Sequence, residues 1–157
     1  MIQQLNNWLN SISTYADMSP DYSIRHQVNR RLALCARDSL SIDDWCQLFS
    51  TQAGDLTTLA FLHERFSEYS GLDFSRIRAH DRLHGDLHLA LVCWHDWVIT
   101  FCEDFYQQFH IDLSDCFDED DYETIGELIT FLLAQVSASE NVSALPGPLV
   151  RVPAGVC

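Results

Sequence analysis

The sequence contains no lysine, and all nine of its Lys and Arg residues are arginines. No Lys or Arg occurs between Leu83 and Val150, whereas this stretch holds thirteen Asp and Glu residues. The formal net charge of −14 therefore belongs mainly to the second half of the chain. An acidic surface repels a phosphate backbone, which disfavours direct binding of nucleic acid. It complements a basic protein partner, and acidic charge that serves only solubility is an equal alternative.

Long apolar runs are also missing. No run approaches the roughly 18 residues that a bilayer-spanning helix needs. The first ten residues, MIQQLNNWLN, contain neither a positive charge nor the continuous apolar core of a signal peptide. We therefore expect a cytoplasmic protein that does not engage a membrane. With 47% apolar residues, a chain of this length can bury a core without added cross-links.

Motifs that would support catalysis or metal binding are few. The six cysteines form no CxxC pair, which in a cytoplasmic protein indicates reduced thiols packed as small apolar side chains. The six glycines are scattered, so no phosphate-binding loop is predicted. His80, His84 and His88 are spaced four apart, but a helix start at residues 85–86 would leave the first two in a loop. Zinc binding by these three is therefore the weaker alternative to solvated histidines, and we expect no enzyme, metal or cofactor.

Apolar side chains recur at helical spacing along most of the chain, which predicts an all-α fold. The expected helices cover residues 2–15, 21–36, 41–49, 55–70, 87–109 and 124–136, with an ordered loop at 72–86. After Val136 the sequence holds three of its four prolines and no periodicity, which predicts a disordered tail. The expected organisation is an N-terminal helical extension (1–54), a helical bundle (55–136) and the tail (137–157).

The ends of several helices carry local signals. Ser41 with Asp44, and Thr124 with Glu127, have the spacing of a capping box, in which two side chains satisfy free N–H groups at a helix start. We expect Asp55 to cap the helix that follows it. Gly71 in turn suits the C-terminal end of that helix.

The strongest amphipathic pattern lies in residues 87–109. Its apolar residues step by four and three, which predicts one continuous helix of about 22 residues that begins after Asp86. The members of this seam are Leu87, Leu91, Trp94, Val98, Phe101, Phe105 and Phe109. Trp94 and Trp97 lie one helical turn apart, and they belong either to the core or to a partner-binding surface.

Three short sequence segments within residues 59–136 resemble segments of the acyl carrier protein fold. IRAHDRLHGDL resembles the loop that ends in Asp-Leu before the second helix of a carrier. FYQQFHIDLSD resembles the end of that helix, and TIGELITFL resembles the start of the last helix. The resemblance implies a four-helix bundle and is closest to uncharacterised bacterial carrier-like families with no known cargo.

A carrier bears phosphopantetheine on a serine at the N-terminus of its second helix, where the helix end favours the phosphate. The equivalent position falls near Asp96 when counted from the end of the helix, and at residues 88–91 when counted from its start. No serine occurs between Ser75 and Ser114. The carrier-like half therefore lacks the attachment site.

The tripeptide Asp38-Ser39-Leu40 is the one that surrounds the serine of acyl carriers. A long helix should follow it in a carrier, whereas the apolar pattern here stops near Phe49. We interpret the tripeptide as a turn before a helix that Ser41 caps. Modification of Ser39 is the alternative.

The predicted function is a non-enzymatic, carrier-like adaptor that has no prosthetic group and docks a basic protein partner. One alternative is an acidic inhibitor or immunity-type protein that blocks a basic active site, and another is a true phosphopantetheine carrier modified at Ser39. The predicted docking residues combine acidic side chains with two tryptophans. They are Trp94, Asp96, Trp97, Glu103, Asp104, Asp112, Asp118, Glu119, Asp120 and Asp121.

Overall fold

A computed structural model describes residues 20–143, and within this range the chain is helical and contains no β-strand. The predicted all-α fold is confirmed. The elements are α2 (Tyr22–Leu34), α3 (Ile42–Phe49), α4 (Asp55–Ser70), α5 (Leu89–Val92), α6 (Trp97–Phe109) and α7 (Ile125–Ser143), with short 3-10 turns η1 (Phe74–Arg76) and η2 (Glu119–Asp121). The expected helix at 2–15 lies outside the described residues. None of the described helices has the length and apolarity that crossing a membrane requires.

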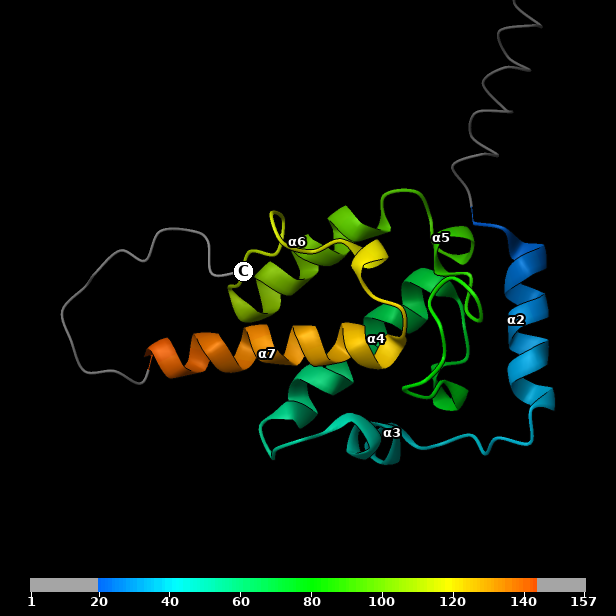
Figure 1. The fold of residues 1–157 in the computed structure, drawn as a ribbon, viewed down its shortest axis with the longest axis horizontal. Helices are drawn as coiled ribbons and strands as arrows, with labels where there is room; N and C mark the ends of the chain where they lie inside the picture. The colour runs from blue at the N-terminus through cyan, green and yellow to red at the C-terminus, as the bar shows by residue number, and fades with distance from the viewer. Residues whose placement is uncertain (1–19, 144–157) are drawn as a thin grey trace, which may run out of the picture.

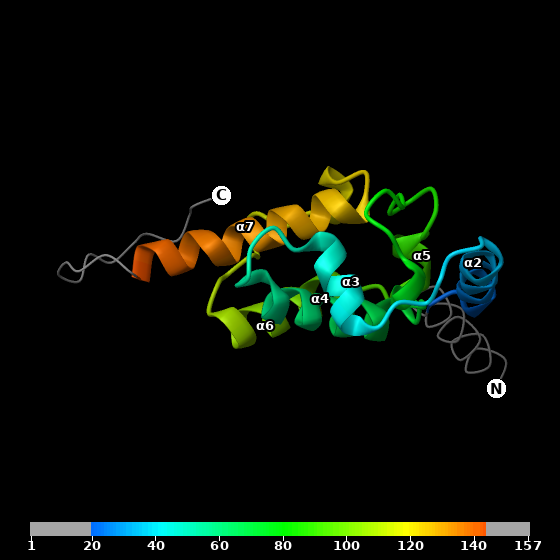
Figure 2. The same cartoon turned by 90° about the horizontal axis from the view of Figure 1, so that it is seen from below.

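The helices pack around one continuous apolar core. In Figure 1, α7 runs horizontally with α6 above it and α3 below it, and α2 stands at the right-hand edge; Figure 2 gives the view from below. Helix α4 contacts α3, α5 and α7, while α2 packs against α5. Aromatic rings join α4 to α6, because the ring centroids of Phe66 and Phe101 lie 5.2 Å apart. The largest fully buried side chains are Trp45, Tyr69, Phe66, Phe74, Phe101 and Phe105.

Helix α3 reaches this core through Trp45. The indole of Trp45 is fully buried, lies 4.5 Å from the ring of Phe49, and donates a hydrogen bond of 3.2 Å to the carbonyl oxygen of Ile77. Val28 and Leu32 of α2 belong to the same buried cluster. Residues before position 54 therefore help to build the core that positions the rest of the chain.

Both predicted capping hydroxyls are in place, and the pair of Thr124 with Glu127 forms a complete capping box, whereas the Asp44 carboxylate accepts the hydroxyl of Ser41 at 2.7 Å. The hydroxyl of Ser41 accepts the N–H of Asp44 at 3.1 Å, and that of Thr124 accepts the N–H of Glu127 at 3.3 Å. The Glu127 carboxylate in turn accepts the N–H of Thr124 at 3.3 Å. Gly71 ends α4 with a φ of 65°, the left-handed conformation that glycine adopts without strain.

The expectation that Asp55 caps α4 is wrong by one position. Gly54 precedes the helix, and Asp55 is its first residue. The Asp55 carboxylate accepts the N–H of Thr51 at 2.8 Å and the N–H of Gln52 at 3.0 Å, so it closes the turn before the helix. Burial opposes ionisation of this carboxyl, but the hydrogen bonds from Thr51 and Gln52 leave its pKa below the ordinary value.

The single long helix expected over residues 87–109 is wrong. The chain forms the short α5, leaves the helix at residues 93–96, and resumes as α6. At the break, carbonyl oxygens of α5 accept hydrogen bonds from the start of α2. The N–H of Asp21 donates to the carbonyl oxygen of Leu91 at 2.8 Å, and the guanidinium of Arg25 donates to that of Val92 at 2.7 Å. Hydrogen bonds from a distant helix thus replace those of a continuous helix.

One further expectation changes at the C-terminal end of the helical region. The tail was expected to begin at residue 137, but α7 continues to Ser143, and the hydroxyl of Ser137 accepts a hydrogen bond of 3.0 Å from the side chain of Gln52. At its other end α7 lies against the long loop, since the N–H of Gly126 donates to the carbonyl oxygen of Ala79 at 3.0 Å. A Cβ at position 126 would lie 2.8 Å from that oxygen, so this approach requires glycine.

Candidate protein-interaction surface

The two tryptophans of the predicted docking set have opposite environments. Trp94 lies in the connection between α5 and α6 and is 41% exposed, while Trp97, in the first turn of α6, is 3% exposed. The Trp97 ring packs against Phe66, Phe101 and Phe117. Trp97 is therefore a core residue, and Trp94 is the tryptophan of the pair that a partner can reach.

Asp104 is engaged within the fold. Its carboxylate accepts a hydrogen bond from the hydroxyl of Tyr69 and lies 3.8 Å from the Nε of Arg65. Burial raises the pKa of the Tyr69 phenol, and the hydrogen bond to Asp104 raises it further. This carboxylate links α6 to α4.

The other predicted acids lie mostly on the surface. Two of them stabilise turns: Asp112 accepts the N–H of Ser114 at 2.9 Å, and Asp118 accepts the N–H of Asp120 at 3.0 Å. The first bond lowers the pKa of Asp112. Glu119 is half-buried. The exposed members of the set are together called the acidic face below. They are Asp96, Glu103, Asp112, Asp118, Asp120 and Asp121.

Arginine side chains of the first half point inward onto the backbone. Arg25 donates to the carbonyl oxygens of Val92 and Tyr69, at 2.7 and 3.0 Å. Arg78 donates to three carbonyls, one of them that of Asp38 at 2.7 Å. The planar guanidinium can bind several oxygens at once in a fixed geometry, which the ammonium group of lysine cannot reproduce. This use of arginine gives the absence of lysine a structural rationale.

The ion pairs of residues 20–143 leave the acidic face largely uncompensated. Arginines pair with acids of α4, α6 and the long loop, and the closest pair is Arg37 with Asp81 at 2.6 Å. The acidic face receives one pairing, from the Nε2 of His84 to Asp120 at 3.2 Å. Arg31, Arg65, Arg76 and Arg82 are likewise paired with acids outside the acidic face.

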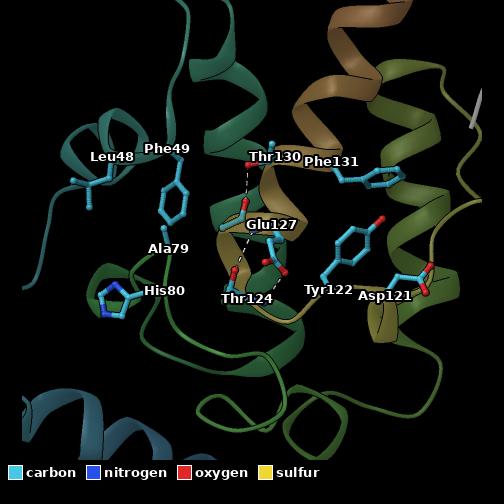
Figure 3. A pocket seen from close by; sticks show the side chains of 11 residues that line it. Leu48, Phe49, Ala79, His80, Asp121, Tyr122, Thr124, Glu127, Thr130 and Phe131 are labelled. Atoms are coloured by element: carbon cyan, nitrogen blue, oxygen red, sulfur yellow. Dashed lines mark hydrogen bonds between the residues drawn. The ribbon is translucent and has the colours of Figure 1, made fainter.

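An open groove of ≈ 890 Å³ lies beside α7 (Figure 3). Phe49 and Leu48 line it from α3, and Tyr122 and Phe131 line it from the opposite side. The Glu127 carboxylate lies between these walls and is held by its capping bonds. The groove was not predicted from the sequence, since Leu48 is apolar like its buried neighbours in α3 but is 55% exposed.

The histidines proposed as metal ligands are held apart. His80 lies 3.3 Å from a guanidinium nitrogen of Arg37, His84 faces Asp120, and His88 adopts a left-handed conformation just before α5. In the described part of the chain, no three His, Cys, Asp or Glu side chains are arranged to hold a metal ion.

Ser39 lies in the extended connection between α2 and α3, not at a helix N-terminus. Its hydroxyl is exposed and is hydrogen-bonded to the hydroxyl of Ser75 at 2.8 Å. The helix dipole and free N–H groups that would favour a phosphodiester therefore do not converge on it.

The cysteines follow the expectation of reduced thiols only in part. Cys35, Cys46, Cys93 and Cys102 are free, and the last three are buried. Burial raises the pKa of the Cys93 thiol to about 12 and that of Cys102 to about 11, which makes both poor nucleophiles. Cys116 instead takes part in a disulfide bond.

Comparison with known proteins gives no match: no protein-family model, curated protein or solved structure is significantly similar to this chain.

Proposed function

We propose that this protein is a non-enzymatic adaptor with an acyl-carrier-like arrangement and no prosthetic group, which docks a basic protein partner. The order of elements supports the carrier-like part. Helix α4 is followed by a long loop, then the short α5 and α6, the short turn η2 and finally α7. This is the order that the resemblance over residues 59–136 implies for a four-helix bundle.

The start of α6 supports the absence of a prosthetic group. Helix α6 begins at Trp97, directly after Asp96, which favours the window around Asp96 over residues 88–91 as the equivalent of the carrier attachment site. The residues there are Trp94, His95, Asp96 and the buried Trp97. None of them offers a hydroxyl for a phosphodiester.

The observation that carries the docking proposal is the separation of charge. Arginine side chains bind backbone carbonyls inside the molecule, while Asp96 and Glu103 are exposed without an arginine partner among residues 20–143. A surface of one sign attracts a partner of the opposite sign and sets its orientation. Trp94, at the edge of this surface, supplies the aromatic contact area that binding sites commonly use.

Charge reversal at Asp96 and Glu103 tests the proposal. Both side chains are exposed and Asp96 makes no side-chain capping bond to α6, so the double variant Asp96→Arg/Glu103→Arg should leave the fold intact. A partner captured from the native cells by the tagged wild-type chain is purified and titrated against both proteins. We expect the variant to bind about tenfold more weakly or worse, and wild-type affinity to fall as ionic strength rises from about 0.05 to 0.5 M.

The matched control is Glu64→Arg/Glu140→Arg, which changes the net charge equally but alters exposed acids outside the acidic face. Equal binding by the two double variants would contradict a specific docking surface. The identity of the partner distinguishes the remaining alternative, because a nuclease or toxin inhibited by this chain would favour an immunity-type inhibitor over an adaptor.

A mass measurement tests the absence of a prosthetic group. After incubation with a phosphopantetheinyl transferase and coenzyme A, we expect the intact mass to stay unchanged, because Ser39 lacks a helix N-terminus beside it. A gain of about 340 Da that disappears in the Ser39→Ala variant would establish a true carrier instead. An acyl carrier protein treated in parallel shows that the enzyme is active.

A further inference from the structure

The groove beside α7 combines two apolar walls with an acidic group between them (Figure 3). Leu48, which is 55% exposed, and Phe49 form one wall. Tyr122 and Phe131 form the other, and the centroids of their rings lie 5.3 Å apart. The volume of ≈ 890 Å³ falls within the range of about 300–1,000 Å³ that is typical of ligand sites, so the groove can hold several side chains of a peptide.

The Glu127 carboxylate is fixed in position between these walls. It accepts the N–H of Glu123 at 2.8 Å and that of Thr124 at 3.3 Å. Both bonds engage Oε2 and the side chain is exposed, so Oε1 is open to a donor from a binding partner. A carboxylate that is already held in place loses little side-chain freedom when it binds a cation.

The charge of the groove favours a basic ligand. Among the described residues that line it, Asp121 and Glu127 are acids and none is an arginine. Asp121 also belongs to the acidic face, so the groove adjoins the surface that we propose for docking. Arg37 lies 3.3 Å from the lining residue His80, but its guanidinium is held by the buried carboxylate of Asp81 at 2.6 Å. The groove therefore presents negative charge beside apolar surface.

We propose that this groove binds a segment of the basic partner in which an arginine or lysine lies between two apolar side chains. The basic group binds Oε1 of Glu127 in a charge-assisted hydrogen bond, while the apolar side chains contact the two walls. Alternate side chains of an extended segment point to the same side, so apolar residues two positions before and after the basic one fit this arrangement.

This inference rests on the proposed function, which supplies a basic partner, and adds the chemistry by which one segment of that partner is recognised. A second copy of the chain is a poorer occupant, because two molecules of net charge −14 repel each other.

Titration of a defined peptide into the isotope-labelled full chain, followed by NMR, tests the groove without the partner. The probe is the acetylated and amidated pentapeptide leucyl-alanyl-arginyl-alanyl-leucine. We expect it to bind with a Kd of about 1 mM or tighter and to shift the amide signals of Leu48, Glu127 and Phe131. Peptides with glutamine in place of the arginine, or alanine in place of both leucines, should bind at least about fivefold more weakly, because each lacks one part of the interaction.

Glu127→Gln removes the charge and keeps the helix cap, since glutamine can accept the same N–H bonds. This variant should bind the arginine peptide about fivefold more weakly than the wild type and bind the glutamine peptide unchanged. The matched control is Glu140→Gln, which removes an exposed acid of α7 that is not among the residues lining the groove, and it should leave both affinities unchanged.

A second pair of variants tests the apolar wall. Leu48→Ser should weaken binding of both peptides, whereas Leu56→Ser, which alters an exposed leucine of α4 outside the groove lining, should not. Binding of the arginine peptide that neither Glu127→Gln nor Leu48→Ser weakens would overturn the inference, as would unshifted groove amides at about 10 mM peptide. Groove amides that shift when the protein alone is diluted would assign the groove to a second copy instead.

The charge reversal at Asp96 and Glu103 decides the docking proposal separately. If that reversal weakens partner binding while the peptide does not bind the groove, the groove inference fails and the docking proposal stands. If the peptide binds as expected while the reversal has no effect, the acidic face fails and the groove remains.

Discussion

Replacing Trp45 by alanine is expected to lower the free energy of unfolding by about 3–5 kcal/mol. The Trp45 side chain is fully buried and packs against Phe49, His63 and Phe74, so its removal leaves a large cavity between α3 and α4. The indole also donates to the carbonyl oxygen of Ile77 at 3.2 Å, and the variant removes this bond and leaves that oxygen only the guanidinium of Arg78, at 3.1 Å. Urea denaturation followed by circular dichroism measures the change.

Trp94→Ala provides the matched control, because it deletes the same side chain from a surface position. We expect a loss of less than about 1 kcal/mol, as for most exposed substitutions. Similar losses for the two variants would mean that α3 does not depend on the Trp45 contact for its place in the core.

The second large effect is expected at the ion pair that closes the long loop. The Asp81 carboxylate is buried, accepts the N–H of Arg78 at 2.8 Å and receives a guanidinium nitrogen of Arg37 at 2.6 Å. The hydrogen bond to Asp81 raises the pKa of Arg37, which remains charged at all relevant pH values. Arg37→Met should lower the free energy of unfolding by about 3 kcal/mol, because it leaves Asp81 charged and buried with one donor.

A double-mutant cycle separates this charge effect from loss of packing. Asp81→Asn on the Arg37→Met background removes the unpaired charge, so the double variant should recover about half of the loss. Arg82→Met is the matched control, since its pair with Asp86 at 3.2 Å lies on the surface, and its effect should be clearly smaller. Strictly additive losses would show that Arg37 acts through packing alone.

The local parts of the fold were predictable from the sequence. The capping pairs of Ser41 with Asp44 and of Thr124 with Glu127 depend on residues three positions apart, and in both the hydroxyl caps the helix start as predicted. The buried face of α7 was equally visible, because its apolar residues recur with the helical period.

The candidate surface was less predictable, because exposure depends on which side of a helix meets the body. Trp94 and Trp97 share one apolar pattern, yet the break between α5 and α6 buries the second and exposes the first. Asp104 looked like its acidic neighbours in the sequence, and only the hydroxyl of Tyr69 distinguishes it. Neither difference leaves a signal in the local sequence.

The sequence by itself determined the helical class, the capped helix starts and the division of charge between the halves, because each depends on composition or on residues a few positions apart. The tertiary structure decided where the apolar seam of residues 87–109 breaks. There the N–H of Asp21 and the guanidinium of Arg25 supply donors to the carbonyls of Leu91 and Val92, about seventy residues away in the chain. An apolar pattern that predicts one helix can be split into two when distant groups donate hydrogen bonds to the backbone carbonyls at the break. The local sequence does not reveal these distant donors.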